Sequence, residues 1–294
     1  MSGRSSPDAV FCTNTPMTTH ATPAPIGVFD SGYGGLTILS EIRRLLPDYD
    51  YIYVGDNARA PYGTRSFEIV YRFTLEAVQY LFNRGCRLVI LACNTASAKA
   101  LRTIQQCDLP HIDASRRVLG VIRPTVEAIG GMTHTGCIGL LATPGTVLSG
   151  SYTAEVAKLF PHYQLYGQPC PMWVPLIENN ETHNAGCDFF VTKYIDALLA
   201  QSSLIDTVIL GCTHYPLIYD KIRASLPSHI TLLSQGHVVA ASLQDYLRRH
   251  PEIESACSRH GECTYLTTES PAKFMETATL FLHDDIVAEQ IELG

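Results

Sequence analysis

Short apolar runs rich in β-branched residues alternate along this chain with longer amphipathic stretches, and this alternation sharply limits the folds open to it. The runs are uniformly apolar, which is typical of strands buried on both faces of a parallel sheet. Helical stretches between such strands indicate βαβ units, so we predict an α/β fold with mainly parallel sheets. The expected strands cover 26–29, 51–55, 88–92, 118–122, 137–142, 164–168, 207–211 and 230–234, and the expected helices cover 36–47, 66–85, 150–161 and 187–200.

Two pairs of segments resemble each other at a separation of roughly 110–120 residues, the length of one small domain. LVILACNTASA at 88–98 resembles TVILGCTHYPL at 207–217, and IGVFDSGYGG at 26–35 resembles IGLLATPGT at 138–146. In a chain of 294 residues, such a repeat predicts two similar α/β domains. Each segment carries an apolar strand into a polar turn, at the carboxyl end where parallel sheets bind ligands. Two facing domains would therefore enclose one pocket lined by equivalent turns.

Composition and charge exclude several classes of protein. Apolar residues make up 46% of the chain, which is enough for sizeable cores and too much for a disordered protein. The net charge of −7 argues against a nucleic-acid partner, because phosphate binding requires a basic surface. No apolar run approaches the roughly 18 residues of a membrane span, so we expect no membrane partner. Residues 1–25 lack the apolar core of a signal peptide, so we predict a disordered leader, with Met17 as an alternative start, and a cytoplasmic protein.

The ten cysteines fit a reducing cytosol better than a disulfide scaffold. No C-x-x-C pair occurs, so nothing indicates a zinc ribbon or a thioredoxin-like redox site. Cys257, His260 and Cys263 form one loose cluster without a nearby fourth ligand, for which a surface loop is favoured over a structural zinc site. We therefore predict no metal site and expect most of the cysteines to be small buried apolar residues.

Cys93 and Cys212 are different, because each ends an apolar strand and precedes a polar turn that can open a helix. Main-chain N–H groups at such a turn favour anions, so we expect them to lower the pKa of each thiol from about 8.5. A buried, inert cysteine is the alternative, but the same placement occurs twice. Two thiols that face each other can remove a proton from one face of a substrate carbon and add a proton to the other. This inverts a stereocentre and requires no metal, flavin or pyridoxal cofactor.

Other polar residues follow the same strands. Asp30 is a candidate to accept a proton from one thiol, and His214 is a candidate to serve the other. For Asp30 and Ser31, the alternative is a helix N-cap. The GYGG turn at 32–35 lacks the spacing of the dinucleotide-binding G-x-G-x-x-G motif, so we expect no such cofactor. Tyr62, in the loop NARAPYG, can cover a ligand or simply pack.

Six motifs occur in order along the chain: IGVFDSGYGGL, GDNARAPYG, LACNTASA, IGLLATPGTV, VPLIE and LGCTHYPL. Over residues 26–282 the chain closely resembles the cofactor-independent glutamate racemases of the aspartate/glutamate racemase superfamily. The resemblance implies two pseudo-symmetric, doubly wound α/β domains with the active site between them. It places 26–117 plus 228–294 in a discontinuous first domain and 118–227 in the second. It also implies an isomerase that interconverts L- and D-glutamate without pyridoxal phosphate and supplies D-glutamate for peptidoglycan.

The resemblance assigns roles to individual residues. Cys93 and Cys212 match the two catalytic thiols, of which the first acts on the D-enantiomer and the second on the L-enantiomer. Asp30 and His214 match the residues that assist these thiols. Backbone amides and hydroxyls suit a substrate with two carboxylates. We also expect the protein to form a homodimer. The positions that match substrate-binding residues are Asp30, Ser31, Tyr62, Gly63, Asn94, Thr95, Thr143, Thr146, Glu178, Thr213 and His214.

The sequence departs from the family pattern at two places. VIRPT at 121–125 stands where V-I-E-P-G is common, which puts Arg123 and Thr125 at the domain junction, and Tyr33 replaces a small aliphatic residue. Alternative functions are an aspartate or hydantoin-type racemase, a non-catalytic amino-acid-binding module, and an inhibitor of a partner enzyme such as gyrase. The paired thiols argue against a binding module. The sequence leaves the inhibitory role, control by cell-wall precursors and the geometry of a dimer open.

Overall fold

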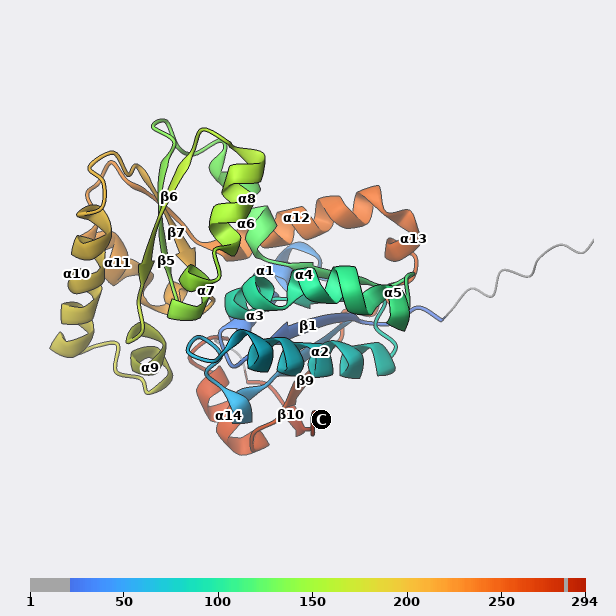
Figure 1. Cartoon of the computed structure of the whole chain (residues 1–294). Coiled ribbons are helices and arrows are strands. Elements are labelled where there is room, and N and C mark those ends of the chain that lie inside the picture. Colours follow the sequence, from blue (N-terminus) through green and yellow to red (C-terminus); the bar gives the residue numbers. More distant parts are fainter. Residues whose placement is uncertain (1–21, 283–284) are drawn as a thin grey trace, which may run out of the picture.

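Two parallel β-sheets organise the structure, a computed structural model that describes residues 22–282 and 285–294 (Figure 1). Within the described residues, one sheet has six strands in the order β10-β9-β2-β1-β3-β4, and the other has four in the order β6-β5-β7-β8. All neighbouring strands in both sheets are parallel. The strands are β1 (Ile26–Asp30), β2 (Tyr51–Gly55), β3 (Leu88–Leu91), β4 (Arg117–Gly120), β5 (Cys137–Ala142), β6 (Gln164–Pro169), β7 (Thr207–Gly211), β8 (Thr231–Leu233), β9 (Cys263–Thr267) and β10 (Ala288–Gln290).

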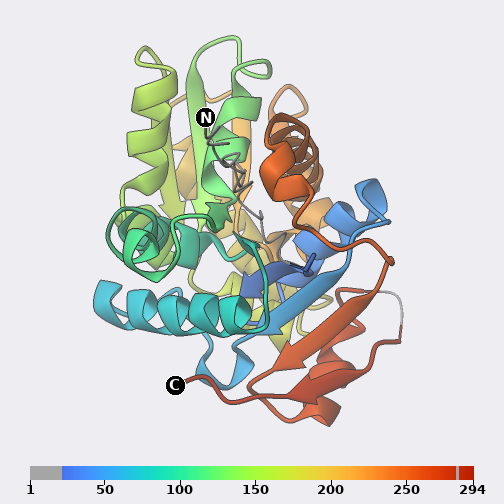
Figure 2. The ribbon, with the colours of Figure 1, turned by 90° about the vertical axis from the view of Figure 1, so that its right-hand side faces the viewer.

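The two sheets share one strand order. The succession β2-β1-β3-β4 in the first sheet corresponds to β6-β5-β7-β8 in the second. The repeated segments of the sequence are thus equivalent strands, β1 with β5 and β3 with β7, which confirms the predicted α/β fold of two similar parallel sheets. Near the C-terminus the chain returns to the first sheet, where β9 pairs with β2 and β10 extends the edge drawn in red in Figure 2.

Helices connect these strands, and side chains of the flanking residues cap several of them. Ser66 and Asn184 accept hydrogen bonds from the main-chain N–H groups of Ile69 and Cys187, which satisfies donors in the first turn of two long helices. The helices are α1 (Gly35–Leu45), α2 (Phe67–Asn83), α3 (Asn94–Lys99), α4 (Leu101–Thr103), α5 (Leu109–Ile112), α6 (Ile122–Ile129), α7 (Pro144–Leu148), α8 (Ser151–Leu159), α9 (Trp173–Glu178), α10 (Ala185–Leu199), α11 (Tyr219–Ser225), α12 (Gln235–Arg249), α13 (Pro251–Glu254) and α14 (Pro271–Ala278), with 3₁₀ turns η1 (Asn57–Arg59) and η3 (Tyr215–Ile218) and a π-helical turn η2 (Ile104–Asp108).

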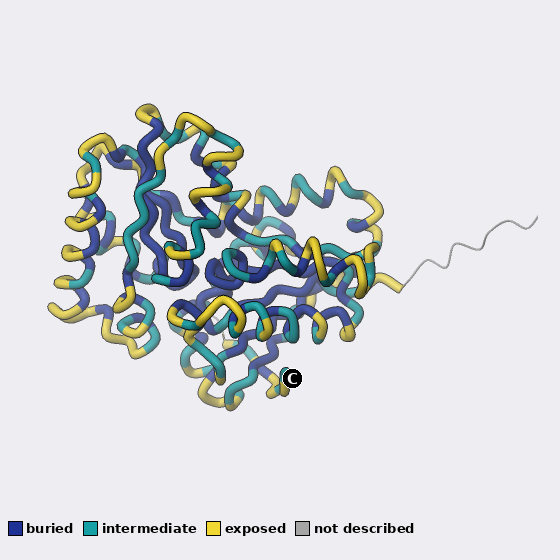
Figure 3. Tube along the Cα trace, viewed as in Figure 1, coloured by how far each residue is buried: buried dark blue, intermediate teal, exposed yellow. Residues whose placement is uncertain are grey.

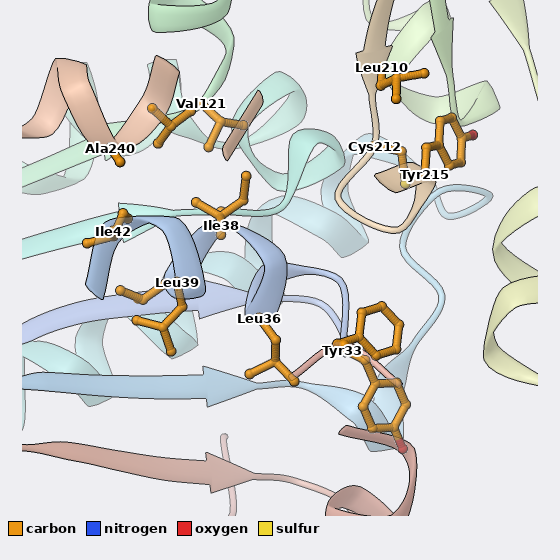
Figure 4. Close-up of a cluster of buried hydrophobic side chains, with 14 of the residues drawn as sticks. Tyr33, Leu36, Ile38, Leu39, Ile42, Val121, Leu210, Cys212, Tyr215 and Ala240 are labelled. Carbon is orange, nitrogen blue, oxygen red and sulfur yellow. The ribbon is translucent and has the colours of Figure 1, made fainter. Parts of the chain in front are cut away.

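Both faces of the first sheet are buried, because successive strand residues point to opposite faces. Val28 of β1 belongs to the core that includes α1 and α12, whereas its neighbour Phe29 packs in the core that includes α2 and α3. Figure 4 shows the apolar side of α1, with Ile38 and Ile42, lying between the strands and α12. The central strands β1, β2, β3, β5 and β7 are buried throughout, and the exposed residues concentrate on the outer helices and loops (Figure 3). This burial explains why the strand segments are uniformly apolar.

The eight predicted strands and four predicted helices all form, with ends within two residues of the expected ones. β9, β10 and α12 are absent from the prediction. β9 begins with two half-buried residues, and in β10 only Ala288 is buried, so neither shows the uniformly apolar pattern of the other strands. α12 buries Val239, Leu243 and Leu247, which recur every four residues, so its amphipathic pattern is visible in the sequence.

Each predicted domain boundary separates one strand from the sheet in which it pairs. The range 118–227 takes in most of β4, which pairs with β3 in the first sheet, and the range 228–294 takes in β8, which pairs with β7 in the second. Strand pairing decides which sheet a strand joins, and pairing cannot be seen in the order of residues along the chain. We therefore propose boundaries that follow the sheets, one between β4 and α6 and the other between β8 and α12.

The predicted leader is described only at its end, since residues 1–21, including Met17, lie outside the described residues. Ala24 forms a parallel bridge with Cys257 and exchanges main-chain hydrogen bonds of 3.0 Å with Ala256 and Ser258. This part of the leader is therefore attached to the first domain. Among the described residues, no helix is both long and apolar enough to cross a membrane.

Candidate active site

Cys93 and Cys212 line one cavity between the two sheets. Cys93 follows β3 and caps α3, and Cys212 follows β7 and precedes η3. Because β3 and β7 are equivalent strands of different sheets, the cavity receives one thiol from each sheet. Figure 4 shows Cys212 at the end of its strand, in the turn that leads to Tyr215. The cavity has a volume of about 90 Å³. One water needs roughly 10–15 Å³ on this measure, so the cavity has room for a small molecule.

Cys93 keeps its proton at neutral pH. Burial raises the pKa of Cys93 to about 12 and the charge of Asp30 adds to the rise, whereas Ser31 and the N–H group of Ala96 act in the opposite direction. The Ser31 Oγ lies 3.2 Å from the Cys93 Sγ, and the Ala96 nitrogen lies 3.4 Å from it. The expectation that the turn lowers the pKa of Cys93 is therefore wrong, because the N–H group contributes less than the desolvation of a buried thiolate.

His214 places a positive charge beside Cys212. The His214 Nδ1 lies 3.9 Å from the Cys212 Sγ, and its Nε2 lies 2.8 Å from the Glu178 Oε1. Burial acts to lower the pKa of His214, but its hydrogen bonds to Cys212 and Glu178 outweigh burial and raise the pKa to about 10. The imidazole is therefore protonated at neutral pH. The Cys212 Sγ therefore has a cation beside it.

Asp30 lies at the carboxyl end of β1 and is completely buried. Burial raises the pKa of Asp30 from 3.8 to about 6, against the charge of His214 and the N–H groups of Gly32 and Gly35. Its carboxylate accepts hydrogen bonds from the Gly32 N–H at 3.3 Å and the Thr213 hydroxyl at 3.4 Å, so it contacts both sheets. Neither Asp30 nor Ser31 is a helix N-cap, because α1 begins at Gly35 and Gly34 occupies the cap position.

The GYGG turn lets β1 approach the second sheet closely. A Cβ atom at Gly34 would overlap the Thr213 Oγ1 and the His214 Nδ1, and a Cβ atom at Gly35 would overlap the Cβ of Asp30. Glycine is therefore needed here for space. Tyr33 points away from this contact, and its ring stacks on Phe274 and Phe281 with centroid distances of 5.5 and 6.0 Å. The ring of Phe281 in turn meets the edge of His214.

Three threonine hydroxyls join the two sheets beside Cys93. The Thr95 Oγ1 lies 2.9 Å from the Thr143 Oγ1 and 3.2 Å from the Thr146 Oγ1, and the last two oxygens lie 3.1 Å apart. Thr95 belongs to α3, whereas Thr143 caps α7 after β5, so equivalent ends of the two sheets meet here. All three side chains are buried. Because hydroxyl hydrogens rotate, this cluster can present donors to an anion in the cavity.

Most of the predicted binding residues line the cavity, and two lie behind its lining. The Tyr62 hydroxyl donates a short hydrogen bond to Asp56, and its ring packs on Phe73. The Gly63 carbonyl accepts a hydrogen bond of 2.7 Å from the Gly145 N–H, which ties the loop of the first sheet to the second. Asp30 and Thr146 lie behind the cavity lining. The predicted residues that line the cavity are Ser31, Tyr62, Gly63, Cys93, Asn94, Thr95, Thr143, Glu178, Cys212, Thr213 and His214.

Sequence reasoning missed three residues of the site. Asp56 holds the Tyr62 hydroxyl, Cys170 lines the cavity as a third thiol, and Gln235 bonds to Asn94. Asp56 and Gln235 each follow a predicted strand almost directly, so the rule that points to Asp30 would also have pointed to them. Cys170 also follows a predicted strand, but burial raises its pKa well above the usual value, and no described residue is a partner of the kind that His214 provides for Cys212.

The cluster of Cys257, His260 and Cys263 serves the structure. The His260 Nδ1 lies 2.6 Å from the buried Asp50 carboxylate, and the Cys257 thiol donates to the Ile253 carbonyl at 3.3 Å. In the part of the chain that the structure describes, no three His, Cys, Asp or Glu side chains are placed to hold a metal ion.

A larger cavity of about 590 Å³ lies elsewhere at the junction of the sheets, where α4, α6, α8 and α12 supply its walls. It contains Arg102, Arg123 and Glu155 but neither Cys93 nor Cys212. The two thiols therefore share only the smaller of these two cavities.

Comparisons with known proteins agree with this geometry. A glutamate racemase of Jannaschia sp. is 41% identical over 276 residues, which cover 90% of this chain and 99% of that protein. The crystal structure of a glutamate racemase isoform from Bacillus anthracis matches with a TM-score of 0.83 and 33% identity, over 92% of this chain and 98% of that one. The crystal structure of a Francisella tularensis glutamate racemase in complex with D-glutamate matches with a TM-score of 0.81 and 30% identity, over the same shares.

A match to a family model identifies the family of this chain. Residues 36–243, well over half of the chain, match the model described as Asp/Glu/Hydantoin racemase. This range contains both cysteines and the turns around them. The chain therefore belongs to the Asp/Glu/hydantoin racemase family, whose members are isomerases.

Proposed function

We propose that this protein interconverts L- and D-glutamate, with Cys93 and Cys212 as its two acid–base groups and without a metal, flavin or pyridoxal cofactor. The proposal is carried by one observation, that equivalent strands of two sheets bring two cysteines to one cavity. Glutamate as the substrate is supported by the names of the relatives and by the similar structure in complex with D-glutamate.

The different surroundings of the thiols suggest how the reaction starts. In the L-to-D direction, a Cys212 thiolate beside His214 removes the α-proton, and the electron pair of the broken C–H bond passes into the α-carboxylate. Cys93, which burial keeps protonated, donates its proton to the opposite face of the α-carbon. The product is D-glutamate. Cys212 is then a thiol and Cys93 a thiolate, which are the states that start the reverse reaction.

The substrate's carboxylates require donors, and the cavity supplies neutral ones. Thr95 and Thr143 line it with hydroxyls, and Asn94 lines it with a carboxamide. Hydrogen bonds from such groups to a carboxylate are charge-assisted and short. We also propose, from the family resemblance, that the protein is a cytoplasmic homodimer that supplies D-glutamate for peptidoglycan. Free thiols at the active site suit a reducing compartment.

Loss of circular dichroism from pure L-glutamate tests the proposed reaction. The purified protein, with excess chelator and no added cofactor, is expected to drive the signal to zero, because the enantiomers have equal free energy. L-Aspartate is expected to react with a kcat/KM at least about tenfold lower, because one missing methylene in a shaped pocket costs about that much. Equal values for the two substrates would identify a broad-specificity racemase, and no reaction of either would contradict the proposal.

Three single substitutions assign the reaction to the two thiols. Cys93→Ser and Cys212→Ser are expected to abolish racemisation, because a serine hydroxyl is too weak an acid to form an anion near neutral pH. Cys137→Ser is the matched control, since Cys137 is as buried as Cys212 but lies at the amino end of β5, away from the cavity. A loss of activity in Cys137→Ser comparable to the other two would point to unfolding in place of chemistry.

A further inference from the structure

Four buried polar side chains form a hydrogen-bonded cluster next to Cys93, and we call it the amide cluster: Asn94, Thr125, Tyr152 and Gln235. Each is at most 2% exposed, and they come from α3, α6, α8 and α12. Of the four, sequence reasoning placed Asn94 at the substrate and singled out Thr125 only as a departure from the family pattern. The reaction proposed above does not use the other two.

The amide cluster joins the two places where the chain passes from one sheet to the other. α6 connects β4 of the first sheet to β5 of the second, and α12 connects β8 of the second sheet to the β9 side of the first. Figure 1 shows α6 beside the start of α12, where the two halves of the molecule meet. Thr125 lies on the first connection and Gln235 opens the second. A hydrogen bond of 2.7 Å between the Gln235 Nε2 and the Thr125 Oγ1 links them.

The roles of the atoms in the amide cluster follow from one fixed point, the main-chain carbonyl of Val121. A carbonyl can only accept, so the Thr125 hydroxyl, 2.7 Å away, must donate to it and can only accept from Gln235. The Gln235 amide must therefore present its Nε2 to Thr125, which leaves its Oε1 toward Asn94. Such a network decides the orientation of an amide whose two ends are otherwise alike.

The same logic fixes Asn94. Because the Gln235 Oε1 can only accept, the Asn94 Nδ2 donates to it at 2.6 Å. The Asn94 Oδ1 then accepts from the Tyr152 hydroxyl at 2.7 Å, while that hydroxyl accepts from the Gln235 Nε2 at 2.9 Å. Among the described residues, the Asn94 Nδ2 has no acceptor other than Gln235, so its second hydrogen is not used inside the protein. Asn94 also lines the cavity, directly after Cys93.

We propose that Thr125, Tyr152 and Gln235 are positioning residues that hold the Asn94 carboxamide with its N–H toward a carboxylate of the substrate. The proposal rests on the proposed racemase function, which supplies the carboxylate. With the opposite orientation, the Asn94 oxygen would face that carboxylate and repel it. The hydroxyl of Thr125 therefore acts on substrate binding through two amides, although it does not line the cavity.

Thr125→Val tests this relay, because valine keeps the shape of threonine and removes the hydroxyl that sets the orientation of Gln235. The KM for L- and D-glutamate is expected to rise about tenfold with little change in kcat, since a charge-assisted hydrogen bond made equally in the bound and transition states is lost. Thr125→Ser restores the hydroxyl and is expected to bring KM back to within about twofold of the parent. Tyr152→Phe, which removes the donor to the Asn94 Oδ1, is expected to raise KM in the same way.

Thr74→Val is the matched control. Thr74 is also completely buried in a helix, and its hydroxyl makes the same 2.7 Å bond to the carbonyl four residues earlier, here Val70, with no further partner among the described residues. It lies in α2, outside the amide cluster and the cavity. Thr74→Val is expected to lower the melting temperature about as much as Thr125→Val while leaving KM unchanged.

The possible results separate this inference from the proposed function. If the parent protein does not racemise glutamate, the proposed function is wrong. If the parent is active but Thr125→Val raises KM no more than Thr74→Val, or if Thr125→Ser does not restore KM, the positioning role is wrong. A fall in kcat at constant KM would also overturn it. If neither Thr125→Val nor Tyr152→Phe folds, the amide cluster serves stability, and the inference is equally rejected.

Discussion

Cys93 and Cys212 occupy equivalent turns but have different electrostatic surroundings. Cys93 has the hydroxyl of Ser31 and the carboxylate of Asp30 near it, and the negative charge opposes loss of its proton. Cys212 has the imidazolium of His214 at 3.9 Å. The fold thus supplies the symmetry of the site, and individual side chains break that symmetry by placing an anion beside one thiol and a cation beside the other.

The pH dependence of kcat/KM tests these two charges. Asp30, with a pKa of about 6, is ionised above that pH, so activity is expected to fall as the pH drops through 6. His214, with a pKa of about 10, is protonated below that pH, so activity is expected to fall as the pH rises through 10. Asp30→Asn should remove the acidic limb of the profile, and His214→Asn should remove the alkaline limb.

His260→Asn is the control for this pH profile, because His260 is also paired with a carboxylate, that of Asp50, but lies outside the cavity. Its profile should match that of the parent. Persistence of both limbs in Asp30→Asn and in His214→Asn would show that other groups control the protonation of the thiols.

At this scale the sequence predicts where a residue lies better than it predicts its protonation. Position after a strand is a local property, so the order of residues is enough to place Asp30, Cys93, Cys212 and His214 just beyond the carboxyl ends of strands or at those ends. The pKa of Cys93 depends on burial and on a charge that is distant in the sequence, and neither can be read from LACNTASA. Gln235 follows its strand in the same way, but only the structure reveals the partners that give it a role.

The turns between strands and helices determine how closely the two sheets approach. The loop after β1 contains Gly34, which adopts ordinary helical backbone angles, so alanine at this position meets no conformational strain. The obstacle is space, because the side chain would overlap Thr213 and His214 on the other sheet. The glycine turn of the first sheet is therefore part of the active-site geometry of the second.

Gly34→Ala tests this close approach. The added methyl group should push His214 and its turn away from Cys212, and a displacement of about 1 Å is expected to lower kcat/KM by about 100-fold. Gly131→Ala is the matched control, because a Cβ atom at Gly131 meets nothing within 4 Å. Steady-state kinetics on both variants checks the expectation. Near-parental activity of Gly34→Ala would mean that the two sheets do not need this contact.

A strand can be predicted from the sequence where its own run of apolar residues is enough to define it. The buried strands are uniformly apolar, and their ends fall within two residues of prediction. β9 and β10 lie toward the edge of the first sheet, and two of the three residues of β10 are exposed, so no uniformly apolar run marks them in the sequence. Sheet membership of β4 and β8 depends on pairing between segments, which is why each predicted domain boundary separates one of these strands from its sheet.

The whole molecule places two copies of one strand arrangement around a single cavity. The order β2-β1-β3-β4 corresponds to β6-β5-β7-β8, and the third strand of each set is followed within two residues by a cysteine that lines the cavity. A planar carbanion formed between the two thiols can accept a proton from either side. Pseudo-symmetry of the fold therefore matches the near-symmetry of a reaction whose substrate and product are mirror images, and our central claim is that each thiol serves one face.

Proton exchange in heavy water by the two single-cysteine variants tests this claim most directly. In Cys93→Ser the remaining Cys212 thiol is expected to deuterate L-glutamate slowly at the α-carbon with retention, because it can exchange its proton with solvent and return it to the same face. Cys212→Ser is expected to deuterate D-glutamate in the same way, through Cys93. Mass spectrometry combined with chiral separation reports both outcomes. Exchange of the same enantiomer by both variants, or racemisation by either at the parental rate, would contradict the assignment of the two cysteines to opposite faces.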